Sequence, residues 1–328
     1  MRTAISDVFH VVRADARECD AGALQGAVVA IGNFDGVHRG HRAVIGAALA
    51  RARSLGRKAA ALTFSPHPRK FFRPQEPLFA LSSEHDKLRL LAATGLDGAV
   101  VMRFDAELAG TSAQDFVERI LVGRLGIGGA AIGFDFHFGQ NRAGSPEYLA
   151  EQGARLGFAV DIVPPLEDEG RPVSSGAVRR ALSEGRVVEA AELLGSPWFV
   201  SGEVVHGEKR GRTLGFPTAN MKLDPACGLK HGIYAVRARV DGRLVDGVAS
   251  FGRRPMFDDG APLLETFLFD FDGDLYGRTI EVALIGWIRP EQKFDSIETL
   301  KRVMASDSAQ ARDALGRASG AFPSLREV

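Results

Sequence analysis

The residues best suited to chemistry are two histidines in a glycine-rich segment, residues 32–41 (GNFDGVHRGH). The apolar run at 27–31 predicts a buried strand before it, and apolar residues at helical spacing predict a helix over 41–55 after it. A glycine-rich turn between a strand and a helix N-terminus suits a phosphate, because free N–H groups and the helix dipole point toward the anion. The segment therefore predicts a phosphate site. Its expected backbone contacts are Gly32, Phe34, Gly36 and Gly40.

His38 and His41 are three residues apart, so both face one side of the first helical turn. Two imidazoles there could donate hydrogen bonds to the phosphate oxygens of a nucleotide. The segment does not predict a zinc site, because no third Cys, His or carboxylate ligand follows at a recognisable interval. The alternative is a pair of solvated histidines that cap the helix. The surrounding glycine-rich segment favours the phosphate site.

The composition is that of an ordinary globular protein and predicts two domains. The chain has 328 residues, 45% of them hydrophobic and 25% charged. Lys+Arg and Asp+Glu both number 41, so no bulk charge favours nucleic acid or an anionic membrane as partner. Cys19 and Cys227 are too few for a disulfide framework. We expect a cytoplasmic protein, because no apolar span or signal-peptide core is present; a weak homo-oligomer is left open.

In the first half, strands alternate with helices, which predicts a doubly wound parallel sheet. The expected strands cover 59–64, 99–102, 129–133 and 158–163, and the expected helices cover 82–94 and 112–121 and begin again at 145.

Three further loops of this half fall at the carboxyl ends of strands, where ligands of open α/β sheets bind. Residues 63–69 (TFSPHPR) form a rigid loop. Residues 133–144 (GFDFHFGQNRAG) offer aromatics and glycines that suit a flat ring and its phosphate; the alternative is a Phe-rich core turn. Residues 173–179 place Ser174 and Ser175 at a helix start and Arg179 one turn later. These three form either a second anion clamp or an ordinary helix cap.

Helical residues are expected over 176–194. The pattern changes after the helix stop at 195–197 (GSP), which sets expected domains of 1–195 and 196–328. A strand is expected over 199–205, and a hairpin over 233–250 with its turn at Asp241-Gly242. A second strand pair is expected over 263–271 and 279–287, around Asp272-Gly273. These strands predict a small antiparallel β-barrel, followed by one or two helices over 296–315.

Two features of the second half could do chemistry. Residues 207–220 (GEKRGRTLGFPTAN) lack the ending of a Walker A loop but offer glycines, cations, and Thr218 and Asn220 as oxygen ligands for Mg²⁺. The alternative is a flexible surface loop. Glu265 shares a strand face with Leu263 and Phe267 by alternation, and carboxylates are rare on apolar faces unless paired or functional. The alternative here is an edge-strand glutamate.

Taken together, these motifs resemble those of the prokaryotic bifunctional riboflavin kinase/FAD synthetase family. Residues 38–41 are similar to the H-x-G-H motif of nucleotidyltransferases, and 63–68 and 133–139 to the family motifs T-F-x-P-H-P and G-x-D-F-x-F-G. Residues 217–220 match P-T-A-N of the kinase module. The resemblance covers nearly the whole chain in six separated motifs. The chain departs from the family at Gly176, where Ser or Thr is usual, and at 251–257, which include Arg254 and Met256.

The resemblance implies that the C-terminal domain phosphorylates riboflavin with ATP and Mg²⁺, and that the N-terminal domain transfers AMP from ATP to FMN, giving FAD and pyrophosphate. It implies that Glu265 is the base for the riboflavin hydroxyl and that Thr218 and Asn220 hold the metal. His38, His41 and Arg179 would stabilise the transferring phosphoryl group. Further contacts to ATP or phosphate are implied at Ser174, Ser175, Gly211, Arg212 and Gly215, and contacts to flavin at Pro66, His67, Asp135, Phe136, Phe138 and Arg142.

Two alternatives remain at this point. A generic nucleotidyltransferase acting on another phosphate, such as phosphopantetheine, would use the first half alone, and the kinase motifs argue against it. A flavin-binding regulator or carrier with one inactive site is favoured by the departures at Gly176 and Arg254. Turnover to FMN and to FAD distinguishes all three.

Overall fold

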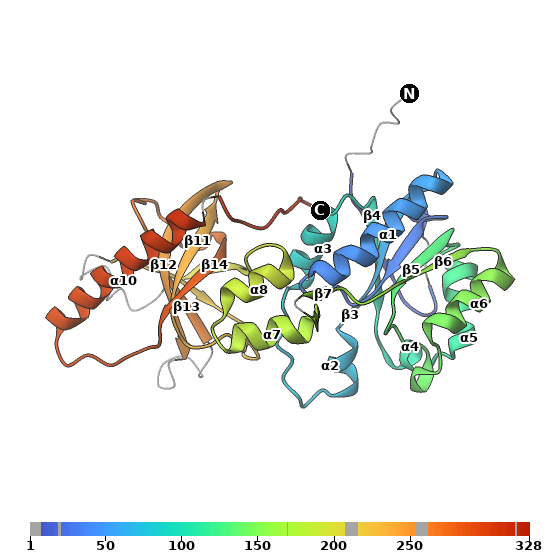
Figure 1. The fold of residues 1–328 in the computed structure, drawn as a ribbon, viewed down its shortest axis with the longest axis horizontal. Helices are drawn as coiled ribbons and strands as arrows, with labels where there is room; N and C mark the ends of the chain where they lie inside the picture. The colour runs from blue at the N-terminus through green and yellow to red at the C-terminus, as the bar shows by residue number, and fades with distance from the viewer. Residues whose placement is uncertain (1–7, 19–20, 169, 207–215, 254–261, 319) are drawn as a thin grey trace, which may run out of the picture. The chain divides into compact units, whose positions relative to one another are not determined.

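The computed structural model describes residues 8–18, 21–168, 170–206, 216–253, 262–318 and 320–328. The chain forms two compact units. The first comprises the described residues up to Leu78, then Ser82–Val173 and Ser324–Val328, and the second comprises Phe79–Leu81 and Ser174–Pro323. Figure 1 draws both units, and each is described by itself.

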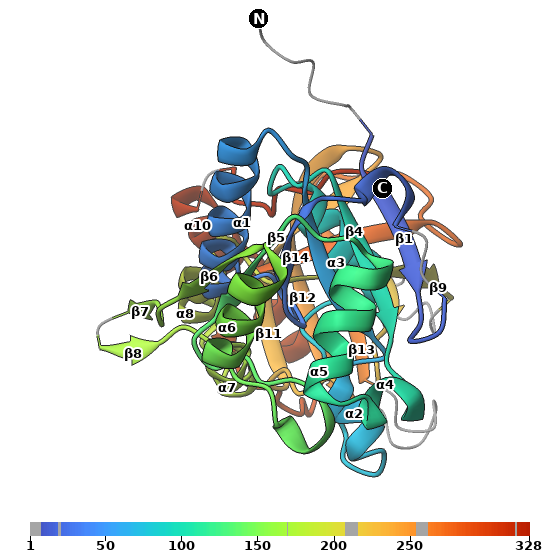
Figure 2. The same ribbon diagram turned by 90° about the vertical axis from the view of Figure 1, so that its right-hand side faces the viewer.

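The first unit contains a parallel sheet, which confirms the predicted α/β class. Its six strands follow the order β1-β4-β3-β2-β5-β6, and every pairing is parallel. Figure 2 shows β1, which the sequence did not predict, beside β4 at one edge. The strands are β1 His10–Ala14, β2 Val28–Ile31, β3 Ala59–Ser65, β4 Gly98–Arg103, β5 Gly129–Gly133 and β6 Ala159–Val163.

Helices cover both faces of this sheet. α1 (Arg39–Leu55) buries Val44, Ile45 and Ala48, and it ends at Gly56, whose φ of +61° is the left-handed cap that glycine favours. The remaining elements are α2 Pro68–Phe72, α3 Glu84–Ala92, α4 Ala106–Gly110, α5 Ala113–Asp115, α6 Pro146–Leu156, a short β7–β8 hairpin of Glu167–Asp168 and Arg171–Pro172, and 3₁₀ turns at Gly22–Leu24 and Gln140–Arg142.

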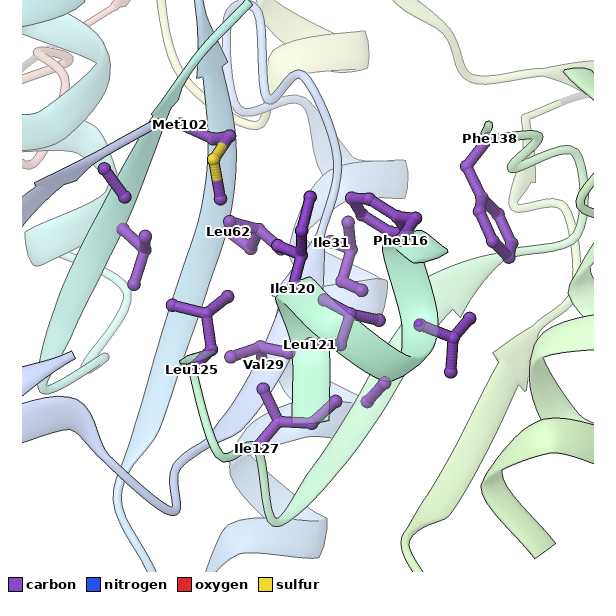
Figure 3. Close-up of a cluster of buried hydrophobic side chains, with 14 of the residues drawn as sticks. Val29, Ile31, Leu62, Met102, Phe116, Ile120, Leu121, Leu125, Ile127 and Phe138 are labelled. Atoms are coloured by element: carbon purple, nitrogen blue, oxygen red, sulfur yellow. The ribbon is translucent and has the colours of Figure 1, made fainter. Parts of the chain in front are cut away.

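The main core of the first unit lies between the sheet and a π-helical segment. The sequence predicted one helix over 112–121, whereas α5 is a single turn and continues as a π-helix over Phe116–Arg124. Figure 3 shows Ile31 and Leu62 of the strands meeting Phe116, Ile120 and Leu121 of this segment. All five side chains are buried, so apolar packing fixes the segment against the sheet.

The second unit contains a closed barrel with strand order β10-β13-β12-β11-β14-β9, which confirms the predicted antiparallel barrel. The expected hairpin turn at Asp241-Gly242 is confirmed, because Val240 pairs with Arg243 and both turn residues have positive φ. The strands are β9 Phe199–Val205, β10 Ala219–Lys222, β11 Gly232–Val240, β12 Arg243–Arg253, β13 Pro262–Leu268 and β14 Thr279–Arg289, and the helices are α7 Ser175–Ser183, α8 Val187–Leu194 and α10 Ile297–Arg317.

The second expected strand pair is wrong. β13 pairs with β10 and β12, while β14 pairs with β11 and β9, so the two are not neighbours in the barrel. The residues between them explain the error. β13 already ends at Leu268, and Phe269 donates its N–H to Asp246 O while Gly277 donates to Val204 O. The connection therefore crosses the barrel end instead of making a tight turn at Asp272-Gly273.

The helices before the barrel also differ from expectation. The sequence predicted continuous helix over 176–194, but the chain turns at Gly185, where φ is +80° and an added Cβ would lie 2.9 Å from the Trp287 ring. Both α7 and α8 belong to the second compact unit. The functional boundary expected at 195/196 stays a prediction.

Candidate active sites

The first site is built on the carboxyl ends of β2, β3 and β5. β2 lies between β3 and β5, so the chain leaves it on one side and later returns on the other. In open α/β sheets, ligands bind at such a switch point. The turn after β2, the loop after β3 and the loop after β5 are three of the segments in which the sequence predicted nucleotide or flavin contacts.

The turn after β2 has an unusual backbone. Phe34 and Val37 have φ of 51° and 44°, which side-chain-bearing residues rarely adopt, and Gly36 has φ of 81°. The buried carboxylate of Asp35 accepts from Ser82 N at 3.2 Å, and Gly36 N donates to Ser82 Oγ at 3.2 Å. The turn is thus held from the segment that precedes α3. Such over-determined strain is typical of ligand-binding turns.

His38 and His41 lie together at the start of α1. Their rings stack with centroids 3.6 Å apart, and His41 N donates to His38 Nδ1 at 3.2 Å. His38 is the N-cap, as the alternative proposed, but it is only 6% exposed and so is not a solvated histidine. Gly40 permits this packing, since a Cβ there would lie 3.1 Å from Val173 O and 3.2 Å from the His38 ring.

The loop after β5 depends on glycine as the sequence suggested. A Cβ at Gly139 would lie 2.6 Å from Ala113 N, and one at Gly144 would lie 2.6 Å from the Phe138 ring. Phe138 is buried against Phe116, as a Phe-rich core turn would place it, and its contact with flavin stays a prediction. Phe136 is partly buried and stacks on Phe138 with centroids 5.5 Å apart, while Asp135 and Arg142 are exposed.

The loop after β3 becomes a short helix that the sequence did not predict. His67 caps α2 by accepting from Arg69 N at 3.1 Å through Nδ1. Pro66 is exposed and His67 is partly buried. Both residues directly follow the carboxyl end of β3, where the flavin contacts were expected.

Ser174, Ser175 and Arg179 belong to the second unit. Ser174 caps α7 by accepting from Ala177 N at 3.2 Å, and Ser175 is the first residue of that helix. Arg179 Nε donates to Phe79 O at 2.6 Å. The structure does not itself join these three residues to His38 and His41, so their shared site stays a prediction.

The second site is a row of polar side chains across three barrel strands. Glu265 of β13 pairs with Asn220 of β10 on one side and with Ser250 of β12 on the other. Directly opposite residues of antiparallel strands point to the same face, so the structure brings Asn220 and Glu265 together. Phe267 follows on that face, with its ring centroid 5.2 Å from that of Phe216. The predicted clustering of a carboxylate with aromatic residues is therefore present.

Asn220 suits a hard cation. It is 5% exposed, its Nδ2 donates to Thr218 O at 3.4 Å, and its Oδ1 is buried with no hydrogen-bond partner among the described residues. A buried acceptor without a partner is costly, and an oxygen ligand for Mg²⁺ would use it. Within the described ranges, no group of three or more His, Cys, Asp or Glu could hold a metal ion. The fit to Mg²⁺ therefore rests on amide and hydroxyl oxygens.

Several expected positions cannot be placed. Gly211, Arg212 and Gly215 lie outside the described residues, as do Arg254 and Met256. Within the described chain, no helix is both long and apolar enough to cross a membrane.

Comparison with known proteins gives consistent matches to both halves. Family models described as FAD synthetase and riboflavin kinase match residues 20–177 and 194–315. A bifunctional riboflavin kinase/FMN adenylyltransferase of Pseudomonas fluorescens is 41% identical over 88% of this chain and 93% of its own length. The protein of that name from Escherichia coli K12 is 39% identical over 89% and 94%. A crystal structure described as a macrolide-efflux protein from Streptococcus pneumoniae has a TM-score of 0.83 and 31% identity, covering 92% of this chain and 99% of its own.

Proposed function

This chain belongs to the family of bifunctional riboflavin kinases/FMN adenylyltransferases, and we propose that the two sites described above divide the two activities between them. The FAD synthetase match lies in the N-terminal part and the riboflavin kinase match in the C-terminal part. Matches to both halves argue against the generic nucleotidyltransferase that uses the first half alone.

At the N-terminal site, an FMN phosphate oxygen attacks the α-phosphorus of ATP, and pyrophosphate leaves. The nucleophile is already anionic, so the site needs charge stabilisation more than a base. His38 Nδ1 accepts from His41 N, so the proton of a neutral His38 ring lies on Nε2, which can donate to a phosphate oxygen. The N-terminus of α1 would add the positive end of the helix dipole, which favours an anion. His41 and Arg179 are the other residues proposed to stabilise charge on the transferring phosphoryl group.

Flavin binding at this site is assigned to the loops after β3 and β5. Phe136 offers a ring that is partly exposed, and Pro66 and His67 lie at the neighbouring strand end. Asp135 and Arg142 are the exposed polar residues of the β5 loop. Phe138 is the last residue assigned to this flavin site, and its ring stacks on that of Phe136.

At the C-terminal site, the riboflavin hydroxyl is neutral and must lose a proton when it attacks the γ-phosphorus of ATP. Glu265 lies on the same barrel face as Asn220 and is the group positioned to accept that proton. Thr218 and Asn220 would hold Mg²⁺. When bound, Mg²⁺ would neutralise charge on the phosphates of ATP.

The observation that carries the kinase assignment is the buried Oδ1 of Asn220, which lies beside Glu265 and has no hydrogen-bond partner in the part of the chain that the structure describes. Asn220→Leu tests it. We expect the Mg²⁺ concentration for half-maximal FMN formation to rise by roughly tenfold or more, as with lost metal-site groups generally. We expect thermal stability to be unchanged or higher, because a buried acceptor is removed. An unchanged Mg²⁺ dependence would exclude Asn220 as a ligand.

ATP, riboflavin and FMN are the proposed small-molecule partners, and no nucleic acid or membrane partner is proposed. Cytoplasmic localisation and weak homo-oligomerisation also stay proposals. Turnover with riboflavin, ATP and Mg²⁺, followed separately to FMN and to FAD, tests both activities. A chain that bound flavin and formed only one product would be the carrier or regulator with one inactive site.

A further inference from the structure

Lys87 has no part in the chemistry described above, yet it is one of the most unusual residues of the first unit. It is 8% exposed and lies in the first turn of α3, where the helix dipole disfavours a cation. Burial lowers its pKa, although Asp35 and Glu84 oppose that shift. Lysine is almost never buried without partners. A residue that is costly to bury at this place needs a structural or functional reason.

The partners of Lys87 are the ends of two neighbouring parallel strands. Its Nζ donates to Thr63 Oγ1 at 3.0 Å, to Phe64 O at 3.3 Å and to Asn33 O at 3.5 Å. Thr63 Oγ1 in turn donates to Asn33 O at 3.1 Å. An ammonium group has three donors, and here it meets three acceptors. One side chain thus joins the end of β3 to the turn that follows β2.

That turn needs support from outside itself. Asn33 precedes Phe34, and both Phe34 and Val37 hold left-handed backbone conformations. For a β-branched residue such as Val37 this conformation is a true outlier, and strain of this kind costs on the order of 1–3 kcal/mol. Ser82 holds the far side of the turn through Asp35 and Gly36, and Lys87 holds its near side through Asn33.

We propose that Lys87 is a positioning residue for adenylyl transfer: its ammonium fixes the strained turn before His38 against the end of β3, at Thr63 and Phe64. The inference rests on the proposed site around His38 and His41. Lys87 acts through backbone carbonyls and the Thr63 hydroxyl, so it does not touch the phosphates. Its loss lets the turn shift relative to the flavin loop after β3.

The test is the single-turnover rate of FAD formation from FMN and ATP, both saturating, in the full chain. Lys87→Met keeps the length of the side chain and removes all three donors. We expect its rate constant to fall by roughly tenfold to a hundredfold, because small misplacements of reacting groups reduce rates by factors of this size. FMN formation by the same preparation should keep the parent rate. A variant that was only less stable would show a smaller amplitude with the parent rate constant.

Lys58→Met is the matched control. Lys58 lies just before β3, and its Nζ donates to Ala23 O, in the turn before β2, at 2.9 Å. It therefore makes a lysine–carbonyl bond near the starts of β2 and β3, whereas Lys87 makes its bonds near their ends. We expect it to leave the rate constant unchanged. An equal fall in Lys58→Met and Lys87→Met, or a parent rate constant in Lys87→Met, overturns the proposal.

Thr63→Val keeps the proposal testable where Lys87→Met does not fold. It removes one acceptor of Lys87 and the bond to Asn33, and it leaves the buried charge in place. We expect a several-fold fall in the same rate constant, and a parent rate constant would overturn the proposal. His41→Ala separates failure of the proposed site from failure of the Lys87 proposal. Parent-rate FAD formation in His41→Ala would reject the site itself. A slower rate in His41→Ala with the parent rate in Lys87→Met would reject only the role of Lys87.

Discussion

The two candidate sites differ in what the backbone does. In the first unit, the candidate residues lie at the ends of parallel strands, where Phe34, Gly36 and Val37 form a turn with positive φ. In the second unit, Asn220, Glu265 and Ser250 simply follow the regular register of three antiparallel strands. Stabilising a phosphate needs convergent N–H groups, which a turn leading into a helix N-terminus can supply. Removing a proton needs one well-placed carboxylate, which a regular strand can supply.

The difference also affects how each site is supported. The turn of the first unit depends on polar partners from outside it, Ser82 and Lys87. The row in the second unit depends on strand pairing and on aromatic neighbours such as Phe267 and Phe216. Changes at the first site should therefore spread through hydrogen bonds, and changes at the second should stay local.

The largest expected effect comes from separating the two units. A fragment that begins near Gly195 should form FMN and no FAD, because it lacks His38 and His41. The structure sharpens this expectation. α8 belongs to the second unit and buries Val187, Leu193 and Leu194, each worth roughly 1.5–3 kcal/mol when fully buried.

A fragment that begins at Ser174 should therefore be distinctly more stable than one that begins at Gly195. Unfolding in urea, followed by tryptophan fluorescence, measures this directly, because both tryptophans, Trp198 and Trp287, lie in the second unit. Equal midpoints for the two fragments would show that α7 and α8 add nothing to the barrel. A folded, flavin-binding fragment with no kinase activity would argue against an independent C-terminal module.

The second effect in size is expected at Glu265. Glu265→Gln keeps the size and hydrogen bonding of the side chain but cannot accept the riboflavin proton, so FMN formation should fall by roughly 10²–10⁴-fold. Riboflavin binding, thermal stability and FAD formation from supplied FMN should change little. Single-turnover phosphorylation with both ligands saturating is the measurement. Glu203→Gln, at an exposed glutamate of β9, is the matched control and should keep the parent rate.

A slightly smaller effect is expected at His41. His41→Ala removes one donor from the phosphate site, and such losses cost on the order of 10²–10³ in rate. FAD formation should fall by about that factor while FMN formation by the same chain continues. His85→Ala, at an exposed histidine of α3, serves as control. Parent-rate FAD synthesis in His41→Ala would remove the stacked histidines from the mechanism.

The two sites were not equally predictable from the sequence. The strand before His38 and the helix after it follow from apolar runs and glycines, and β5 and β9 have the predicted bounds. The β13–β14 pairing failed because Asp272-Gly273 has the composition of a tight turn, while barrel closure decided the partners. The π-helix after α5 has no local signal, since its apolar spacing also fits an α-helix.

Lys87 shows the same limit at the level of a single residue. Ser83 caps α3, and a lysine one turn into a capped helix is usually exposed, so nothing in the local sequence marks this one as buried. Its partners are more than twenty residues away, on β3 and in the turn that follows β2. The signal that could have found it is indirect: the parallel sheet predicts that the ends of β2 and β3 lie together, and each of them leaves polar groups that need a donor.

The smallest expected effect is on the stability of the second unit at alkaline pH. Cys227 is a free, partly buried cysteine of the second unit, and burial raises the pKa of its thiol from 9.0 to about 11. The folded state therefore keeps a proton that the unfolded state loses. This contribution to stability is fully present below pH 9 and is lost as the pH rises through about 11. Its upper bound is roughly 3 kcal/mol, since each pKa unit is worth about 1.4 kcal/mol. In Lys87 of the first unit the pKa shift has the opposite sign, so that residue does not add to the loss.

We expect the urea midpoint reported by tryptophan fluorescence to fall between pH 8.5 and 10.5, and to fall less steeply in Cys227→Ala. Burial also raises the pKa of Tyr234, and Cys227 adds to that shift, so the difference between the two slopes reports Cys227 together with its effect on Tyr234. Parallel slopes would show that the thiol titrates as it does in the unfolded chain.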